Sequence, residues 1–106
     1  MKIKTSEATP LQLNWLVAQC EGLASYVEVV EGFKPSTDWV QGGSIIEREL
    51  IEIGRQGDEW IACINVPENG DWESNGEYGA TPLIAAMRCY VASKLGDEVE
   101  IPEELK

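Results

Sequence analysis

The sequence predicts an α+β fold in which a small antiparallel sheet packs with three helices. Two Thr-Pro-Leu segments, at residues 9–11 and 81–83, place a capping hydroxyl before a proline, which is typical of a helix start. Between them, two runs rich in β-branched and aromatic residues flank the turn Gln56-Gly57-Asp58, as in a β-hairpin. Because 106 residues are too few for two separate cores, we expect one domain over residues 1–106.

The first helix is expected over residues 10–21, and Gly22 follows it as a left-handed terminator. Apolar residues recur at helical spacing and give this helix one buried face, formed by Leu13, Leu16, Val17 and Cys20. The run of β-branched residues at 26–30 then predicts a short strand, because glycine and proline stop it soon afterwards.

The second helix is expected over residues 37–49 and begins at a polar cluster. Ser36 or Thr37 can accept a hydrogen bond from the free N–H groups of the first turn. Asp38 adds a negative charge at the positive end of the helix dipole. These side chains therefore have a structural role available to them at the start of a helix.

An apolar stripe with a gap is expected on this second helix, formed by Trp39, Gly43, Ile46 and Leu50. The glycine would let another element approach closely. A later helix start stays open, since Gly42 and Gly43 each cost about 1 kcal/mol in a helix. In that alternative, Ser44 and Glu47 form a Ser-x-x-Glu capping box.

The hairpin is expected within residues 50–66, and the acidic, glycine-rich segment 67–79 is expected to be an exposed loop or a loose edge strand. Trp72 and Tyr78 in this segment are candidate binding residues. The alternative is that both aromatic side chains fold back and cover the edge of the sheet, because burial of a large aromatic is strongly stabilising.

The third helix is expected over residues 82–95, and Gly96 ends it. It is apolar on most sides, which predicts that other elements cover it. Arg88 lies in its middle, where a basic residue usually pairs with a carboxylate, and Glu47 or Asp38 are candidates for that partner.

An acidic C-terminal arm over residues 97–106 completes the predicted domain. Val99 and Ile101 alternate with polar residues, so the arm could dock as an extended segment or fray from the end of the fold.

The formal net charge of −11 disfavours direct contact with nucleic acid or an anionic membrane, because phosphate groups are repelled. A basic protein partner stays open, as does a surface that is merely solvated. The first residues lack the apolar run of a secretory signal, and no stretch approaches the roughly twenty apolar residues that span a bilayer. We therefore expect a cytoplasmic location.

The composition argues against most catalytic chemistry. Histidine is absent, which removes the commonest general base and the usual nucleophile pairs. Cys20, Cys63 and Cys89 are expected to be buried and reduced. Asp38, Glu47 and Glu49 could supply oxygen ligands to magnesium, but their spacing on one helix does not converge them on one point. We expect no cofactor and no metal ion.

Three blocks of residues suggest a known family. They are Lys4-Thr5-Ser6-Glu7, the segment 35–49 with its Ser-Thr-Asp-Trp and Gly-Gly motifs, and the long block 81–99. On these blocks the chain resembles the NinX-like proteins of lambdoid phages and prophages. The match weakens over residues 23–34 and 54–79, and Ser44 stands where this family is expected to have proline.

The resemblance, with a likeness to a phage domain described as an α-β-α sandwich, implies an antiparallel sheet with helices on both faces. It also implies a phage or prophage protein in the cytoplasm of a bacterial host, and it brings no catalytic residues. We expect a non-enzymatic accessory protein that binds a host or phage protein, with homo-oligomers left open, through Trp72, Tyr78, Asp38 and Trp39. The alternatives are an acidic DNA mimic that inhibits a DNA-binding protein, or a small-ligand or metal-dependent enzyme that uses Asp38 and its neighbours.

Overall fold

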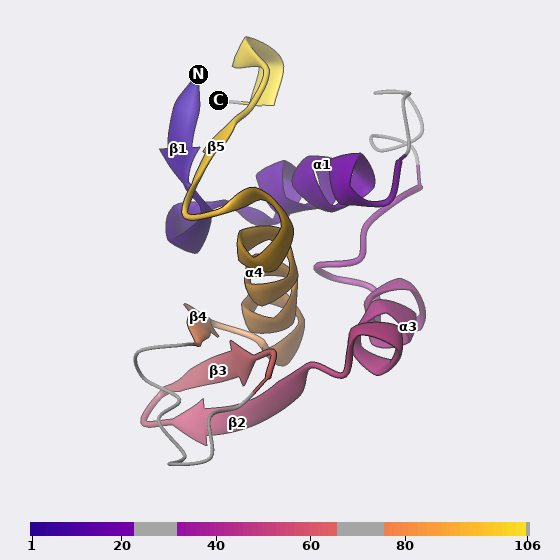
Figure 1. Cartoon of the computed structure of the whole chain (residues 1–106), viewed down its shortest axis with the longest axis vertical. Helices are drawn as coiled ribbons and strands as arrows, with labels where there is room; N and C mark the ends of the chain where they lie inside the picture. Colours follow the sequence, from indigo (N-terminus) through magenta and orange to yellow (C-terminus); the bar gives the residue numbers. More distant parts are fainter. Residues whose placement is uncertain (23–31, 66–75, 106) are drawn as a thin grey trace.

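The computed structural model describes residues 1–22, 32–65 and 76–105. These residues contain three α-helices and two antiparallel sheets, so the α+β prediction is confirmed (Figure 1). The elements are β1 (Lys2–Lys4), α1 (Pro10–Cys20), α3 (Trp39–Glu49), β2 (Glu52–Gln56), β3 (Glu59–Cys63), β4 (Glu77–Gly79), α4 (Pro82–Leu95) and β5 (Glu98–Glu100). The strand predicted at residues 26–30 lies outside the described residues.

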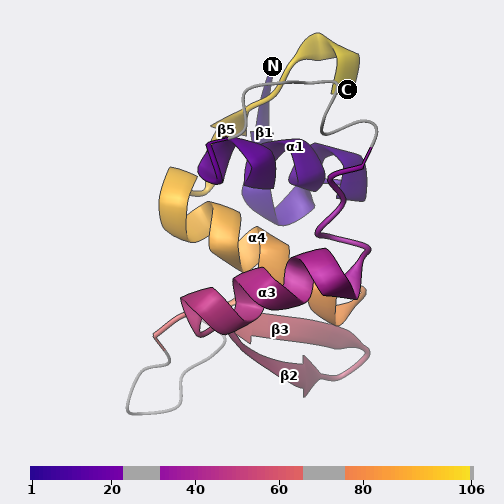
Figure 2. The same cartoon turned by 90° about the vertical axis from the view of Figure 1, so that its right-hand side faces the viewer.

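Helix α4 is the centre of the fold. It lies between α1 on one side and the sheet β2-β3-β4 on the other, and α3 packs beside it (Figures 1 and 2). The other elements bury it on most sides, as its apolar sequence predicts, with Met87 and Val91 fully enclosed against Leu13, Leu16 and Val17 of α1. The two sheets lie at opposite ends of this helical layer (Figure 1).

The predicted hairpin is present as β2 and β3, which pair from Glu52 opposite Cys63 to Gln56 opposite Glu59. Strand β4 then adds antiparallel to β3, and Tyr78 lies opposite Ile61. The hairpin starts later than the predicted residue 50, because the chain first closes the end of α3.

The C-terminal arm is docked. Its strand β5 pairs antiparallel with β1, with Ile3 opposite Val99, and Val99 is buried. The buried Thr5 fastens this two-stranded sheet to the end of α4, since its N–H donates to Asp97 O at 2.9 Å and its hydroxyl to Gly96 O at 2.7 Å. Strand β1 was not predicted, because its partner is distant in the sequence.

Two of the three helix starts were predicted correctly in detail. Thr9 caps α1 and Thr81 caps α4, and a proline follows each as the first helical residue. The cap of α3 is a correction: Asp38 occupies it, whereas Ser36 is buried and donates its hydroxyl to Asn14 Oδ1 at 2.6 Å. Helix α3 begins at Trp39, so the later start at Ser44 is wrong.

The predicted partner of Arg88 is also wrong. Its guanidinium donates to two backbone carbonyls, Nη1 to Tyr78 O at 2.8 Å and Nη2 to Ala8 O at 2.9 Å. Arg88 therefore ties α4 to β4 and to the segment before α1, and it bonds to neither Glu47 nor Asp38.

Candidate functional site

Asp38 and its neighbours form a closed network at the start of α3. One carboxylate oxygen of Asp38 accepts from Val40 N at 3.0 Å, and the other accepts from Gln41 Nε2 at 3.0 Å. The same Gln41 amide holds the preceding segment, since its Oε1 accepts from Lys34 N at 2.8 Å. Both oxygens of Asp38 are thus used to fix the backbone where the chain enters the helix.

The face that α3 buries differs from the predicted stripe. Gly42 and Ile45 face the core, and a Cβ added to Gly42 would lie only 2.3 Å from Pro35 O. Trp39, by contrast, is 57% exposed, and nothing lies within 4 Å of a Cβ added to Gly43. The helix is turned so that its close contact uses the first glycine of the pair. Trp39 and Leu50 at the two ends of the predicted stripe are exposed, while Ile46 is half-buried against the core.

This rotation leaves an apolar surface exposed on α3. Among the described residues, three of the five exposed large hydrophobic side chains lie on α3 or at its end: Trp39 at 57%, Val40 at 84% and Leu50 at 79%. We call these three residues, with Gly43 and Ile46 between them, the outer α3 surface. Exposed large apolar side chains gathered on one helix of a small protein are typical of an interaction site.

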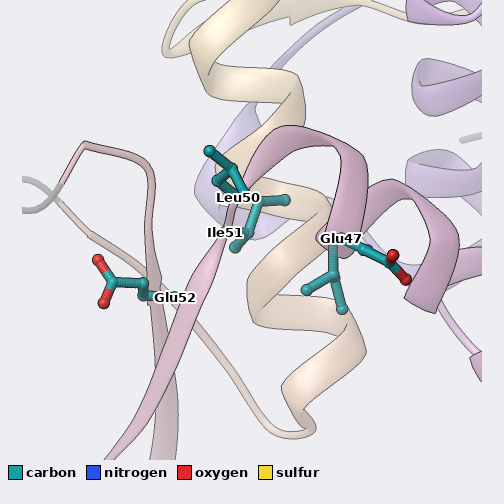
Figure 3. Close-up of a pocket in the computed structure, with 5 residues that line it drawn as sticks. Glu47, Leu50, Ile51 and Glu52 are labelled. Atoms are coloured by element: carbon teal, nitrogen blue, oxygen red, sulfur yellow. The ribbon is translucent and has the colours of Figure 1, made fainter.

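A groove continues this surface at the C-terminal end of α3. It is shallow and open to solvent, has a volume of about 450 Å³, and is lined by Ile46, Glu47, Leu50, Ile51 and Glu52. In Figure 3, Glu47 and Glu52 lie on opposite sides of Leu50 and Ile51. An apolar floor between two exposed carboxylates can receive an aliphatic side chain that has a cation nearby.

A second, smaller pocket of about 190 Å³ adjoins the start of α3 and is lined by Ser36, Thr37, Trp39 and residues 81–84. None of these lining residues is ionisable. Its volume is below the range of about 300–1,000 Å³ that is usual for small-molecule sites. The residues of this pocket do not supply an acid, a base or a metal ligand.

The remaining candidate residues lie elsewhere. Tyr78 is half-buried on β4 and lines neither of the two pockets on α3. Trp72 lies outside the described residues. In the described part of the chain, no group of three histidine, cysteine or acidic residues could hold a metal ion. None of its helices is long and apolar enough to cross a bilayer.

The three cysteines are poor nucleophiles. Cys63 and Cys89 are buried and Cys20 is half-buried, and all three carry free thiols. Burial raises the pKa of Cys20 to about 11 and that of Cys89 to about 12. The thiolate is the reactive form, so these thiols are almost entirely protonated at neutral pH.

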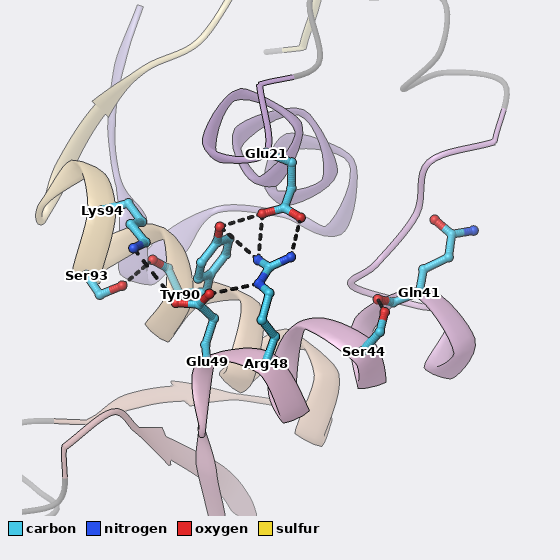
Figure 4. Close-up of polar contacts among 8 residues, drawn as sticks. All are labelled: Glu21, Gln41, Ser44, Arg48, Glu49, Tyr90, Ser93 and Lys94. Atoms are coloured by element: carbon cyan, nitrogen blue, oxygen red, sulfur yellow. Dashed lines mark hydrogen bonds and ion pairs between the residues drawn. The ribbon is translucent and has the colours of Figure 1, made fainter.

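The last turn of α3 carries a network of ions that joins three helices (Figure 4). Arg48 donates to Glu21 through two nitrogens, at 2.8 and 2.7 Å, and its Nε donates to Glu49 at 2.9 Å. Tyr90 of α4 donates its hydroxyl to Glu21 and lies under the guanidinium. The hydrogen bonds from Arg48 lower the pKa of the Glu21 carboxyl, and the bond from Tyr90 lowers it further.

This network predicts a pH-dependent stability. The Glu21 pKa is lower in the folded chain than its ordinary value near 4.5, so its stabilisation is present above that value and is lost as the pH falls through the folded-state pKa. We expect Glu21→Gln to lower the free energy of unfolding at pH 7 by about 1 kcal/mol, a figure that allows for solvent screening. The difference should vanish at acid pH in urea titrations. Glu47→Gln, at an exposed position on α3, is the control, and equal effects of both substitutions would contradict the prediction.

Comparison with known protein families finds a family model that matches the chain. Residues 4–94 match the family model described as Bacteriophage P22, NinX. The match covers most of the chain, and it includes α1, α3, the hairpin and nearly all of α4. No curated protein matches the chain.

Proposed function

We propose that this chain, which belongs to the bacteriophage P22 NinX family, is a non-enzymatic phage or prophage accessory protein that binds another protein through its outer α3 surface. The observation that carries the proposal is the exposure of Trp39, Val40 and Leu50 on one helix. Tryptophan at such a position is typical of residues that dominate binding energy.

The net charge of the chain indicates the charge of its partner. The chain carries a net charge of −11, so two copies repel each other, while a basic surface is attracted. We therefore propose a basic host or phage protein in the bacterial cytoplasm as the partner, with complementary charge accelerating the encounter.

The two alternative functions have less support. Each carboxylate oxygen of Asp38 already accepts a hydrogen bond at the start of α3, so capping of the helix accounts for its position without a substrate or a metal ion. A DNA mimic needs an uninterrupted row of carboxylates. In the β1-β5 sheet, Glu98 and Glu100 lie opposite Lys4 and Lys2, so positive charges interrupt such a row.

The proposal is tested by affinity capture from a phage-infected culture with matched variants. We expect the double substitution Trp39→Ser and Val40→Ser to reduce the captured partner at least about ten-fold, because it removes the apolar centre of the surface. Leu11→Ser is the control, since Leu11 is 48% exposed but lies on α1. Capture that is absent with the wild-type chain, or unchanged by the double substitution, would refute the proposed function.

A further inference from the structure

The groove at the end of α3 has a shape and charge that define its ligand. We infer that it receives an aliphatic side chain from a basic amphipathic helix of the partner protein. The inference rests on the proposed function. It adds the class of partner segment that binds, and it identifies Leu50 as the residue of this chain that contacts that segment.

Leu50 is the first observation. It ends α3 in the left-handed conformation, with φ of 56° and ψ of 45°. The hydrogen bonds are those of a Schellman ending, Ile51 N to Ile46 O at 3.0 Å and Leu50 N to Glu47 O at 3.4 Å. Glycine usually occupies this position, and a residue with a Cβ costs about 1 kcal/mol there.

The Leu50 side chain does not offset this cost within the chain, because it is 79% exposed. The position thus combines backbone strain with an exposed large aliphatic group, and glycine or asparagine would avoid both. Strain and exposure at the same residue are typical of a site kept for function. Leu50 is therefore the aliphatic contact that the groove presents to a partner.

Charge is the second observation. Glu47 and Glu52 are exposed and flank the apolar floor (Figure 3). The nearest basic residue along the helix, Arg48, does not neutralise them, since its guanidinium is bonded to Glu21 and Glu49. A ligand with lysine or arginine beside its aliphatic anchor complements this rim.

Helical spacing is the third observation. Trp39, Gly43, Ile46 and Leu50 lie on one stripe along α3, in which Trp39 and Leu50 are exposed, Ile46 is half-buried, and space is open above Gly43. Apolar side chains at alternating spacings of three and four form a stripe through which one helix packs against another. The gap at Gly43 lets that helix approach closely, so an amphipathic helix fits the surface along its length.

The experiment measures peptide binding by backbone amide shifts of the labelled protein. The probe is a synthetic peptide of about four helical turns, with leucine on one face and lysine on the other. Two comparison peptides carry glutamate in place of lysine, or the same residues in a scrambled order. We expect only the amphipathic lysine peptide to bind, with the largest shifts at residues 46–52.

Three variants locate the contact. Leu50→Gly should weaken binding at least about ten-fold and leave the melting temperature equal or higher, because the strain is relieved. Leu50→Asn should do the same. The double substitution Glu47→Gln and Glu52→Gln should weaken binding about three-fold or more at low salt, and the loss should shrink at high salt.

Several outcomes would overturn the inference: equal affinity of Leu50→Gly and wild type, equal binding of the glutamate or scrambled peptide, or shifts centred on the acidic arm. Shifts at 46–52 that follow protein concentration would assign the groove to a second copy of the chain. The proposed function and the groove inference can fail independently of each other. If a captured partner depends on Trp39 and Val40 but not on Leu50, the function stands and the groove inference falls.

Discussion

Gly42→Ala is expected to destabilise the protein by about 2 kcal/mol and to lower its melting temperature by roughly 10 °C. The new methyl group would lie 2.3 Å from Pro35 O and 2.5 Å from Leu83 Cδ2, so the turn before α3 must move and the Leu83 side chain must rotate away. The backbone carbonyl is the more serious obstacle, because it belongs to a buried turn that Ser36 fastens to Asn14.

The neighbouring glycine is the control for this prediction. Gly43→Ala places its methyl group in open space on the same helix, so helix propensity alone should stabilise the protein by about 0.5–1 kcal/mol. Adjacent glycines should therefore give effects of opposite sign in thermal and urea unfolding. Equal effects would mean that α3 does not pack through Gly42.

The helices could be predicted from the sequence because their signals are local. Thr9 and Thr81 each directly precede a proline, Gly22 directly follows Glu21, the C-cap of α1, and Gly96 is the C-cap of α4. A capping hydroxyl acts on N–H groups within the next few residues, so such a signal is read correctly without knowledge of the rest of the fold.

The rotation of α3 could not be predicted in the same way. The helix offers two rows that both combine a glycine with isoleucine, one through Gly42 and Ile45 and the other through Gly43 and Ile46. Hydrophobic spacing fits either row. The turn at Pro35 and the side chain of Leu83 select the first row. They lie so close to Gly42 that only a residue without a Cβ fits there.

Because the sequence does not show which row of α3 is buried, it also does not identify the candidate site. In the sequence, Trp39 and Leu50 look like core residues, and their exposure appears only once Gly42 is known to face inward. One local signal points to Leu50: it directly follows the last helical residue, where glycine or asparagine usually stands. An aliphatic residue at that position marks a conflict between stability and another requirement.

The contacts of Arg88 cannot be predicted from sequence patterns, because they join residues far apart in the chain. They are nevertheless expected to contribute strongly to stability. Its carbonyl acceptors belong to Tyr78 and Ala8, and Ala8 is separated from it by 80 residues. Any residue has a carbonyl, so no pattern of side chains identifies these acceptors. Burial lowers the pKa of Arg88, but a guanidinium remains charged. Its two hydrogen bonds offset part of the loss of water, and its Nε is buried without a hydrogen-bond partner among the described residues.

Arg88→Ala is therefore expected to lower the free energy of unfolding by about 2–3 kcal/mol, because two carbonyls lose a charged donor. Arg88→Lys should recover part of this loss, since one ammonium group cannot reach both carbonyls with the geometry of a guanidinium. Arg55→Ala is the control: Arg55 is exposed and lies 5.0 Å from the Trp60 ring centroid, so its removal should cost only about 0.5 kcal/mol. Urea unfolding of the three variants measures the order of their free energies of unfolding. If Arg88→Lys equals wild type, a single positive charge is sufficient, and the two-carbonyl bridge is not what holds the middle of α4 to β4 and to the segment before α1.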